Sequence, residues 1–202
     1  MKNVFIAVFA SLLLTLPLST VSGDNDKLHK DHKFFSRLSG YNEVHFIAGD
    51  TTATPIVPPA LRGAISTKAS GAFEAILNRN EDIIDYVLSY KDLEGTVTQA
   101  HIHFGQRHTV GGIVVWLCQT STNPAPVAVR SLTPACPTPD GTVKGTITAA
   151  QVLAQPAQGF AVAGEFEELV RALRAGAAYA NVHTSLHGPG EIRGQIESAH
   201  NH

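Results

Sequence analysis

Apolar and polar side chains alternate along the stretch Gln99-Ala100-His101-Ile102-His103-Phe104-Gly105. Successive side chains of a β-strand point to opposite faces, so the apolar residues of this stretch would share one face. His101 and His103 would then lie side by side on the opposite face. The pattern predicts a strand that packs its apolar face in a core and carries a pair of imidazoles on the other.

A second stretch repeats this arrangement, in Ala178-Tyr179-Ala180-Asn181-Val182-His183-Thr184. Its alanines and valine would face the core, and Tyr179, Asn181 and His183 would face away from it. Two strands that each carry imidazole on the outer face can share one site. The rest of the chain would then be the scaffold that holds these strands together.

Neutral imidazole is a good ligand for copper or zinc. We therefore predict a mononuclear copper or zinc site at His101, His103 and His183, with His108 and His187 as candidates for a further ligand. The alternative is a structural role, in which the histidines donate hydrogen bonds to loop carbonyls or to polar side chains and lock the strands together. Candidate partners for that role are Glu43, Glu191 and Gln195.

The composition describes one globular domain. The chain has 202 residues, of which 44% are hydrophobic and 16% charged, enough for a single core. The net charge of −2 offers no electrostatic basis for binding nucleic acid, which needs a clustered basic surface. We therefore expect no nucleic-acid partner.

The N-terminal segment has the order of a secretory signal peptide. A short positive start is followed by an apolar run over residues 4–18 and by small or polar residues up to Gly23. We predict a signal peptide over residues 1–23, a flexible polar segment over 24–33 and a polar tail over 199–202. The mature protein would be secreted or extracytoplasmic and free of the membrane after cleavage; the alternative is a retained membrane anchor.

Short strand patterns separated by turns fill the remaining chain, which is typical of an all-β Greek-key β-sandwich or barrel, immunoglobulin-like or superoxide-dismutase-like. The hairpin 72–90 is joined by a polar turn, and the nearly all-apolar strand 112–118 is expected to be central. One α-helix is predicted over 164–175, ending at Gly176. The predicted strands are 34–40, 72–77, 83–90, 97–104, 112–118, 141–148, 178–184 and 191–197.

The chain has two cysteines, Cys118 and Cys136, which bracket most of the Pro-, Thr- and Ser-rich segment 120–139. In an exported protein we expect them to form a disulfide. Closing a loop of this size would stabilise the fold by about 3 kcal/mol in the chain-entropy model.

Two pairs of sequence runs resemble the signature of the CHRD domain, a module named for its repeats in chordin. The first pair is TQAHIHFG at 98–105 and GGIVV at 111–115, and the second is YANVHT at 179–184 and GEIRGQI at 190–196. The resemblance covers residues 34–198. It implies an all-β, exported and mostly non-enzymatic module that binds an undefined extracellular ligand or protein.

The order of His101, His103 and His183 is also similar to the copper-site strands of copper/zinc superoxide dismutases. That resemblance implies that these histidines bind copper and that Arg193 guides an anion. It makes a superoxide dismutase-like copper oxidoreductase the alternative function. The departures are the missing counterparts of the metal-bridging histidine and of the zinc-loop ligands. For Arg193 we favour a cross-strand ion pair with Glu191, Glu197 or a neighbouring carboxylate over the guidance of an anion.

A third hypothesis is a recognition module without chemistry, which would use exposed loops on a rigid scaffold. The Pro-containing segments 51–59 and 120–139 are the candidates for such loops. No nucleophile elbow, phosphate-binding loop or HExxH motif occurs in the sequence, and the interpretation favours a binding module over an enzyme.

Overall fold

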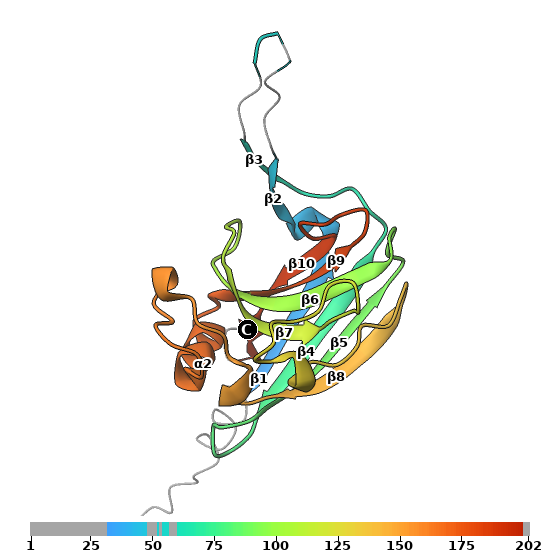
Figure 1. The fold of residues 1–202 in the computed structure, drawn as a ribbon. Helices are drawn as coiled ribbons and strands as arrows, with labels where there is room; N and C mark the ends of the chain where they lie inside the picture. Colours follow the sequence, from blue (N-terminus) through green and yellow to red (C-terminus); the bar gives the residue numbers. More distant parts are fainter. Residues whose placement is uncertain (1–31, 48–51, 53, 57–59, 200–202) are drawn as a thin grey trace, which may run out of the picture.

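The structure is a computed structural model that describes residues 32–47, 52, 54–56 and 60–199. Nine antiparallel strands of this part form one sheet that curls into a nearly closed barrel (Figure 1). This confirms the predicted all-β class. The strands of the sheet are β1 (Lys33–Ser39), β4 (Ser70–Leu77), β5 (Ile84–Lys91), β6 (Val97–Phe104), β7 (Gly112–Cys118), β8 (Gly141–Ile147), β9 (Ala178–Thr184), β10 (Ile192–Gln195) and β11 (Glu197–Ser198).

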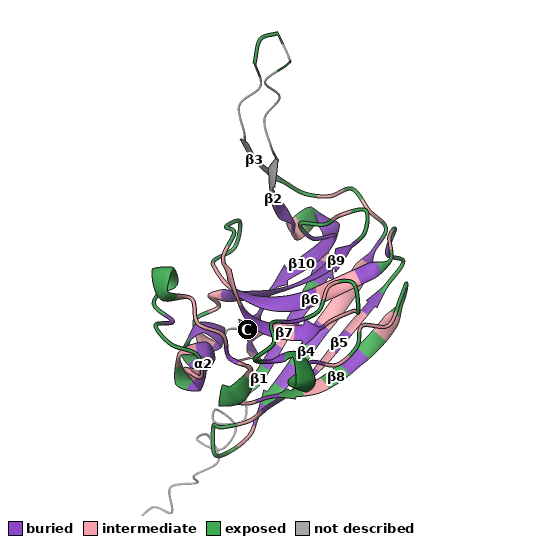
Figure 2. Cartoon of the chain, viewed as in Figure 1, coloured by how far each residue is buried: buried purple, intermediate pink, exposed green. Residues whose placement is uncertain are grey.

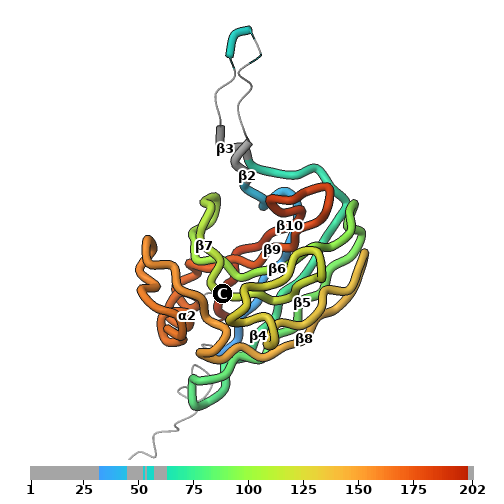
Figure 3. The backbone as a smooth tube through the Cα atoms, viewed as in Figure 1, coloured from blue at the N-terminus to red at the C-terminus, as the bar shows by residue number. Residues whose placement is uncertain are grey.

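Strands that are distant in sequence lie side by side in the barrel. The order is β7-β6-β9-β10-β1-β4-β5-β8, with β11 paired to β1. The first strand therefore joins the hairpin β4–β5 to the C-terminal strands, and β6 is the direct neighbour of β9 (Figure 3). A separate hairpin of β2 (Val44–Ile47) and β3 (Ala60–Gly63) projects from one end of the barrel (Figure 1).

The apolar face of each strand fills the barrel interior. On β5, the residues at every second position from Ile84 to Tyr90 are buried, as the alternation predicts. Figure 2 shows buried residues along β9 and β10 over their whole length, whereas on β8 exposed residues alternate with intermediate or buried ones. The largest fully buried side chains include Phe34, Phe73, Leu88 and Ile102, so the core is built from both halves of the chain.

The prediction that residues 112–118 form a central strand is wrong, because β7 ends the sheet order. It is nevertheless apolar for a physical reason, since the segment after β8 covers its free edge. Leu153 donates its backbone N–H to the carbonyl of Val114, and the side-chain amide of Gln155 donates to the carbonyl of Ile113. An edge strand covered in this way is no longer exposed to pairing with another chain.

The predicted helix is α2 (Phe166–Arg174), which packs at the side of the barrel (Figure 1). Its buried face includes Leu169, Val170 and Leu173, and Gly176 follows it with a φ of 63°, as expected for a helix stop. Four short 3₁₀-helices complete the described part. They are η1 (Gly40–Asn42), η2 (Arg130–Leu132), η3 (Ala149–Gln151) and η4 (Pro156–Gln158).

Cys118 and Cys136 form the predicted disulfide. The predicted signal peptide lies outside the described residues, as does most of the polar segment 24–33, although β1 already begins at Lys33. The helices found among the described residues are all too short or too polar to cross a membrane.

Candidate metal centre

The register between β6 and β9 brings the predicted histidines to one face. His101 pairs with Asn181, His103 with Tyr179, and Gln99 with His183. His183 is therefore diagonal to His101, and diagonal neighbours on one sheet face are within reach of long side chains. The predicted convergence of the three histidines from distant parts of the chain is present in the structure.

The three imidazoles form a tight group. His101 Nδ1 lies 3.2 Å from His183 Nε2, and one nitrogen from each of the three rings lies within 4.8 Å of the others. The ring centroids of His101 and His183 are 4.9 Å apart, and those of His101 and His103 are 5.5 Å apart. Trp116, on the neighbouring strand β7, packs edge-on against His101 with centroids 4.3 Å apart.

Two loop carbonyls fix the orientation of two of the rings. His103 Nδ1 donates to the carbonyl of Gly111 at 2.9 Å, and His183 Nδ1 donates to the carbonyl of Gly188 at 2.8 Å. In a neutral imidazole, a proton on Nδ1 leaves a lone pair on Nε2. Both rings are thus held as the tautomer that can bind a metal through Nε2, as the outer hydrogen bond of a metal-binding histidine does.

The outer face of these strands is not open to solvent. His101, His103 and His183 have exposed fractions of 0%, 8% and 6%. Strand alternation correctly separates the two faces, but the loop 105–111 and the turn 185–190 fold over the second one. Within this covered face, His101 Nε2 and His103 Nε2 have no hydrogen-bond partner.

Burial also keeps two of the imidazoles neutral. Desolvation, followed by the neighbouring His183 and His103, holds the pKa of His101 well below its ordinary value of 6.5. Desolvation lowers the pKa of His103 to about 4, against a smaller opposing effect of its hydrogen bond to Gly111. Both rings therefore have a lone pair available at neutral pH, which is the form that binds metals.

Arg193 lies under the loop rather than at an open entrance. Its guanidinium stacks on Tyr179 at 3.3 Å from the ring centroid, and the Tyr179 ring also stacks in parallel with His103 at a centroid distance of 4.7 Å. Arg193 is 2% exposed and donates to the carbonyls of Thr109 and Gln106. In this structure it holds the covering loop, which does not match the exposed cation that anion guidance requires.

The glutamates considered as partners of Arg193 make other contacts. Glu197 forms an ion pair with Arg107 at 2.9 Å. Glu191 accepts hydrogen bonds from the hydroxyls of Thr67 and Thr184 and from the backbone N–H of Glu94. The carboxyl group whose charge acts on Arg193 is instead that of Glu43, just before β2.

Two further residues extend the site: Asn181, which alternation places on the same face as His183, and Glu43, which lies outside both strands. Asn181 Oδ1 lies 3.1 Å from His183 Nε2, and its side chain forms a hydrogen bond with the Glu43 carboxyl group. Glu43 is 2% exposed, and its burial raises its pKa to about 8 despite the charge of Arg193. Glu43 was a candidate partner for the histidines, but Asn181 stands between it and His183.

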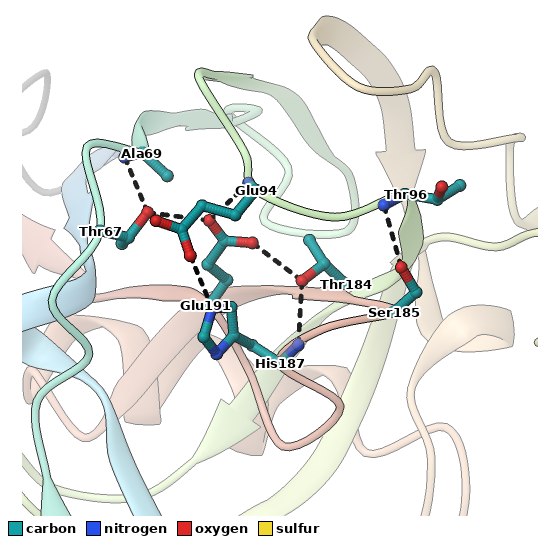
Figure 4. Close-up of polar contacts among 8 residues, drawn as sticks. All are labelled: Thr67, Ala69, Glu94, Thr96, Thr184, Ser185, His187 and Glu191. Carbon is teal, nitrogen blue, oxygen red and sulfur yellow. Dashed lines mark hydrogen bonds and ion pairs between the residues drawn. The ribbon is translucent and has the colours of Figure 1, made fainter.

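The two additional ligand candidates lie away from the three histidines. His108 is exposed in the loop 105–111. His187 forms a second group with Glu94 and Glu191, in which His187 Nε2 lies 3.1 Å from Glu94 Oε2 (Figure 4). In that group the buried Glu191 carboxylate is held by the donors drawn in Figure 4, which supports a role in fastening the loop before β6 to the turn after β9.

The fold and the site define an antiparallel β-barrel module with a covered cluster of histidines. The chain belongs to the CHRD domain family, whose model matches residues 34–196. No curated protein and no solved structure matches the chain. Membership of this family supports a binding module, and the disulfide fits a location outside the cytoplasm.

Proposed function

We propose that this CHRD domain is a secreted module that binds one copper or zinc ion through His101, His103 and His183. The main support is the contact between His101 Nδ1 and His183 Nε2 at 3.2 Å, beside a third imidazole whose Nε2 has no partner. With metal–nitrogen distances of about 2.05 Å, two nitrogens 3.2 Å apart subtend about 103° at the metal, which is close to tetrahedral.

The structural alternative explains part of this arrangement. The hydrogen bonds of His103 and His183 to loop carbonyls do fasten two loops to the barrel. That role does not account for the buried Nε2 atom of His103, because an unpaired buried polar group costs about 1–3 kcal/mol. A bound ion would satisfy this nitrogen, which the protein leaves without a partner.

Metal content tests this proposal directly. The chain is purified without an affinity tag, loaded with zinc or copper, dialysed and measured by elemental analysis. We expect about one equivalent, and a sharp loss of metal in His101→Asn and His183→Asn. His108→Asn is the matched control, because this histidine is exposed and belongs to neither group. Retention of less than about a tenth of an equivalent by the wild-type protein would contradict the proposal.

The single tryptophan offers a second readout. Trp116 packs against His101, so a paramagnetic Cu²⁺ ion held by that histidine should quench its fluorescence, whereas Zn²⁺ should not. Titration with both ions then places the metal near β7 and separates site binding from loose binding by surface histidines. Quenching by Cu²⁺ that survives in His101→Asn would argue that the ion binds elsewhere.

We propose that residues 1–23 direct export and are removed. The support is the order of a positive start, an apolar run and small residues, together with a disulfide that an oxidising compartment permits. N-terminal sequencing of the mature protein from culture medium or envelope fractions tests this. A mature chain that still begins at Met1 would contradict it.

A further inference from the structure

We infer that the amide oxygen of Asn181 is the fourth ligand of the histidine site, which makes it a closed site for a divalent ion rather than a Cu⁺ site. This inference rests on the proposed metal binding by the three histidines. It assigns a role to a residue that lies opposite His101 on the neighbouring strand, among the three imidazoles.

Glu43 determines which end of the Asn181 amide faces the histidines. The Glu43 carboxyl group lies on the same side as the N–H₂ group of the Asn181 amide, and a hydrogen bond from that group to the carboxyl group lowers the pKa of Glu43. A β-carbon placed on Gly190 would lie 2.6 Å from Glu43 Oε1 and 3.0 Å from Asn181 Nδ2, which puts both atoms on the same side of the site. The amide oxygen is left to face His183 Nε2 at 3.1 Å.

The contact between Asn181 and His183 then joins two acceptors. His183 uses its Nδ1 proton for the carbonyl of Gly188, so its Nε2 presents a lone pair to the Asn181 oxygen. The same Nε2 lies 3.2 Å from His101 Nδ1. A proton on His101 Nδ1 could be donated to this lone pair, but it would leave the Asn181 oxygen facing an acceptor, whereas a cation between them attracts all three atoms at once.

The distances suit such a cation. For ligand distances of about 2.05 Å, a separation of 3.1 Å between the Asn181 oxygen and His183 Nε2 subtends about 98° at the metal. The nitrogen of His103 lies within 4.8 Å of those of His101 and His183, so it can join them and the amide oxygen in a four-ligand shell. Structural zinc sites have four protein ligands, whereas catalytic ones keep a position open for water or substrate. The arrangement therefore favours retention of an ion over catalysis.

An amide oxygen also discriminates between ions. Carbonyl oxygen is a hard ligand that suits divalent cations, whereas Cu⁺ prefers soft ligands and gains little from it. Asn181→Leu keeps a similar volume and removes the oxygen. We expect it to weaken Zn²⁺ binding at least about tenfold and to change Cu⁺ binding less than about twofold, both measured by competition with a chelator of known affinity.

Two further variants keep this test decisive. Thr133→Val removes a buried, hydrogen-bonded polar group that contacts Val129, and it controls for a general loss of stability. Glu43→Gln keeps the size of the side chain but lets the Asn181 amide turn its N–H₂ group toward the histidines. It should weaken Zn²⁺ selectively even if Asn181→Leu fails to fold.

The outcomes separate this inference from the proposed function. Selective loss of Zn²⁺ affinity in Asn181→Leu or Glu43→Gln supports the inference. Equal weakening of both ions, or no change in either, would overturn it while leaving the three-histidine site intact. Failure of the wild-type protein to bind either ion would instead remove the proposed function, and the fourth ligand with it.

Discussion

Acid should destabilise the metal-free protein through His103. Burial lowers the pKa of this residue to about 4, whereas the same group in the unfolded chain titrates near 6.5. Between these values the unfolded chain takes up a proton that the folded protein does not, so the free energy of unfolding falls. The contribution of His103 is complete above pH 6.5 and is lost as the pH falls through 4.

The magnitude follows from the two pKa values. A fall from 6.5 to about 4 corresponds to about 3 kcal/mol in the free energy of unfolding. Most of this, about 2 kcal/mol, would be lost between about pH 7 and about pH 4.5. The buried Glu43 acts in the opposite direction, because its raised pKa of about 8 makes stability fall as the pH rises from 4.5 to 8.

The assay compares wild-type protein with His103→Asn by urea unfolding in a chelator over this pH range. The asparagine amide can still donate to the carbonyl of Gly111 but does not titrate. The wild-type protein should lose about 2 kcal/mol more than the variant on acidification, since the effect of Glu43 is common to both. His108→Asn should follow the wild-type curve. Parallel pH curves for wild type and His103→Asn would refute the reasoning.

Two other predictions concern the scaffold. Replacing Cys118 and Cys136 together by serine should lower the free energy of unfolding by about 3 kcal/mol, as expected for a separation of 18 residues, and a loss below about 1 kcal/mol in urea unfolding would contradict this. Gly176→Ala should cost about 1 kcal/mol in thermal unfolding because φ is 63° there. Gly188→Ala, where an added β-carbon meets no atom within 4 Å, should melt like the wild type.

The features that the sequence predicts well are those that alternation encodes locally. The predicted bounds of β6 and β9 agree with the structure, because apolar and polar residues alternate over most of each strand, at 99–104 and at 178–183. The same period places His101 and His103 on one face. Alternation along β9 puts His183 on the same face as His101 and His103 once β9 pairs with β6. The sequence interpretation therefore had to assume only that these two strands are neighbours.

The features that escape the sequence depend on contacts between distant segments. Glu43 reaches Asn181 because Ser39, at the end of β1, pairs with Arg193 on β10, and β10 pairs with β9. No local pattern marks that path. In the same way, Arg193 lies under the loop 105–111 because it donates hydrogen bonds to the carbonyls of Thr109 and Gln106. These carbonyls come within its reach only when the loop is folded.

The polar residues of β6 and β9 lie on the outer face of the sheet, and this face is buried. Strands that are covered on both faces normally carry apolar residues on each of them. Here the interior face follows that rule, with Ile102 and Val182 fully buried, yet the covered outer face keeps His101, Asn181 and His183. An apolar face would avoid the cost of buried polar atoms, and a face meant for solvent would not be sealed by loops. A cluster of acceptors that is both covered and incompletely paired therefore points to a bound cation, and the metal-free protein should be less stable than its loaded form.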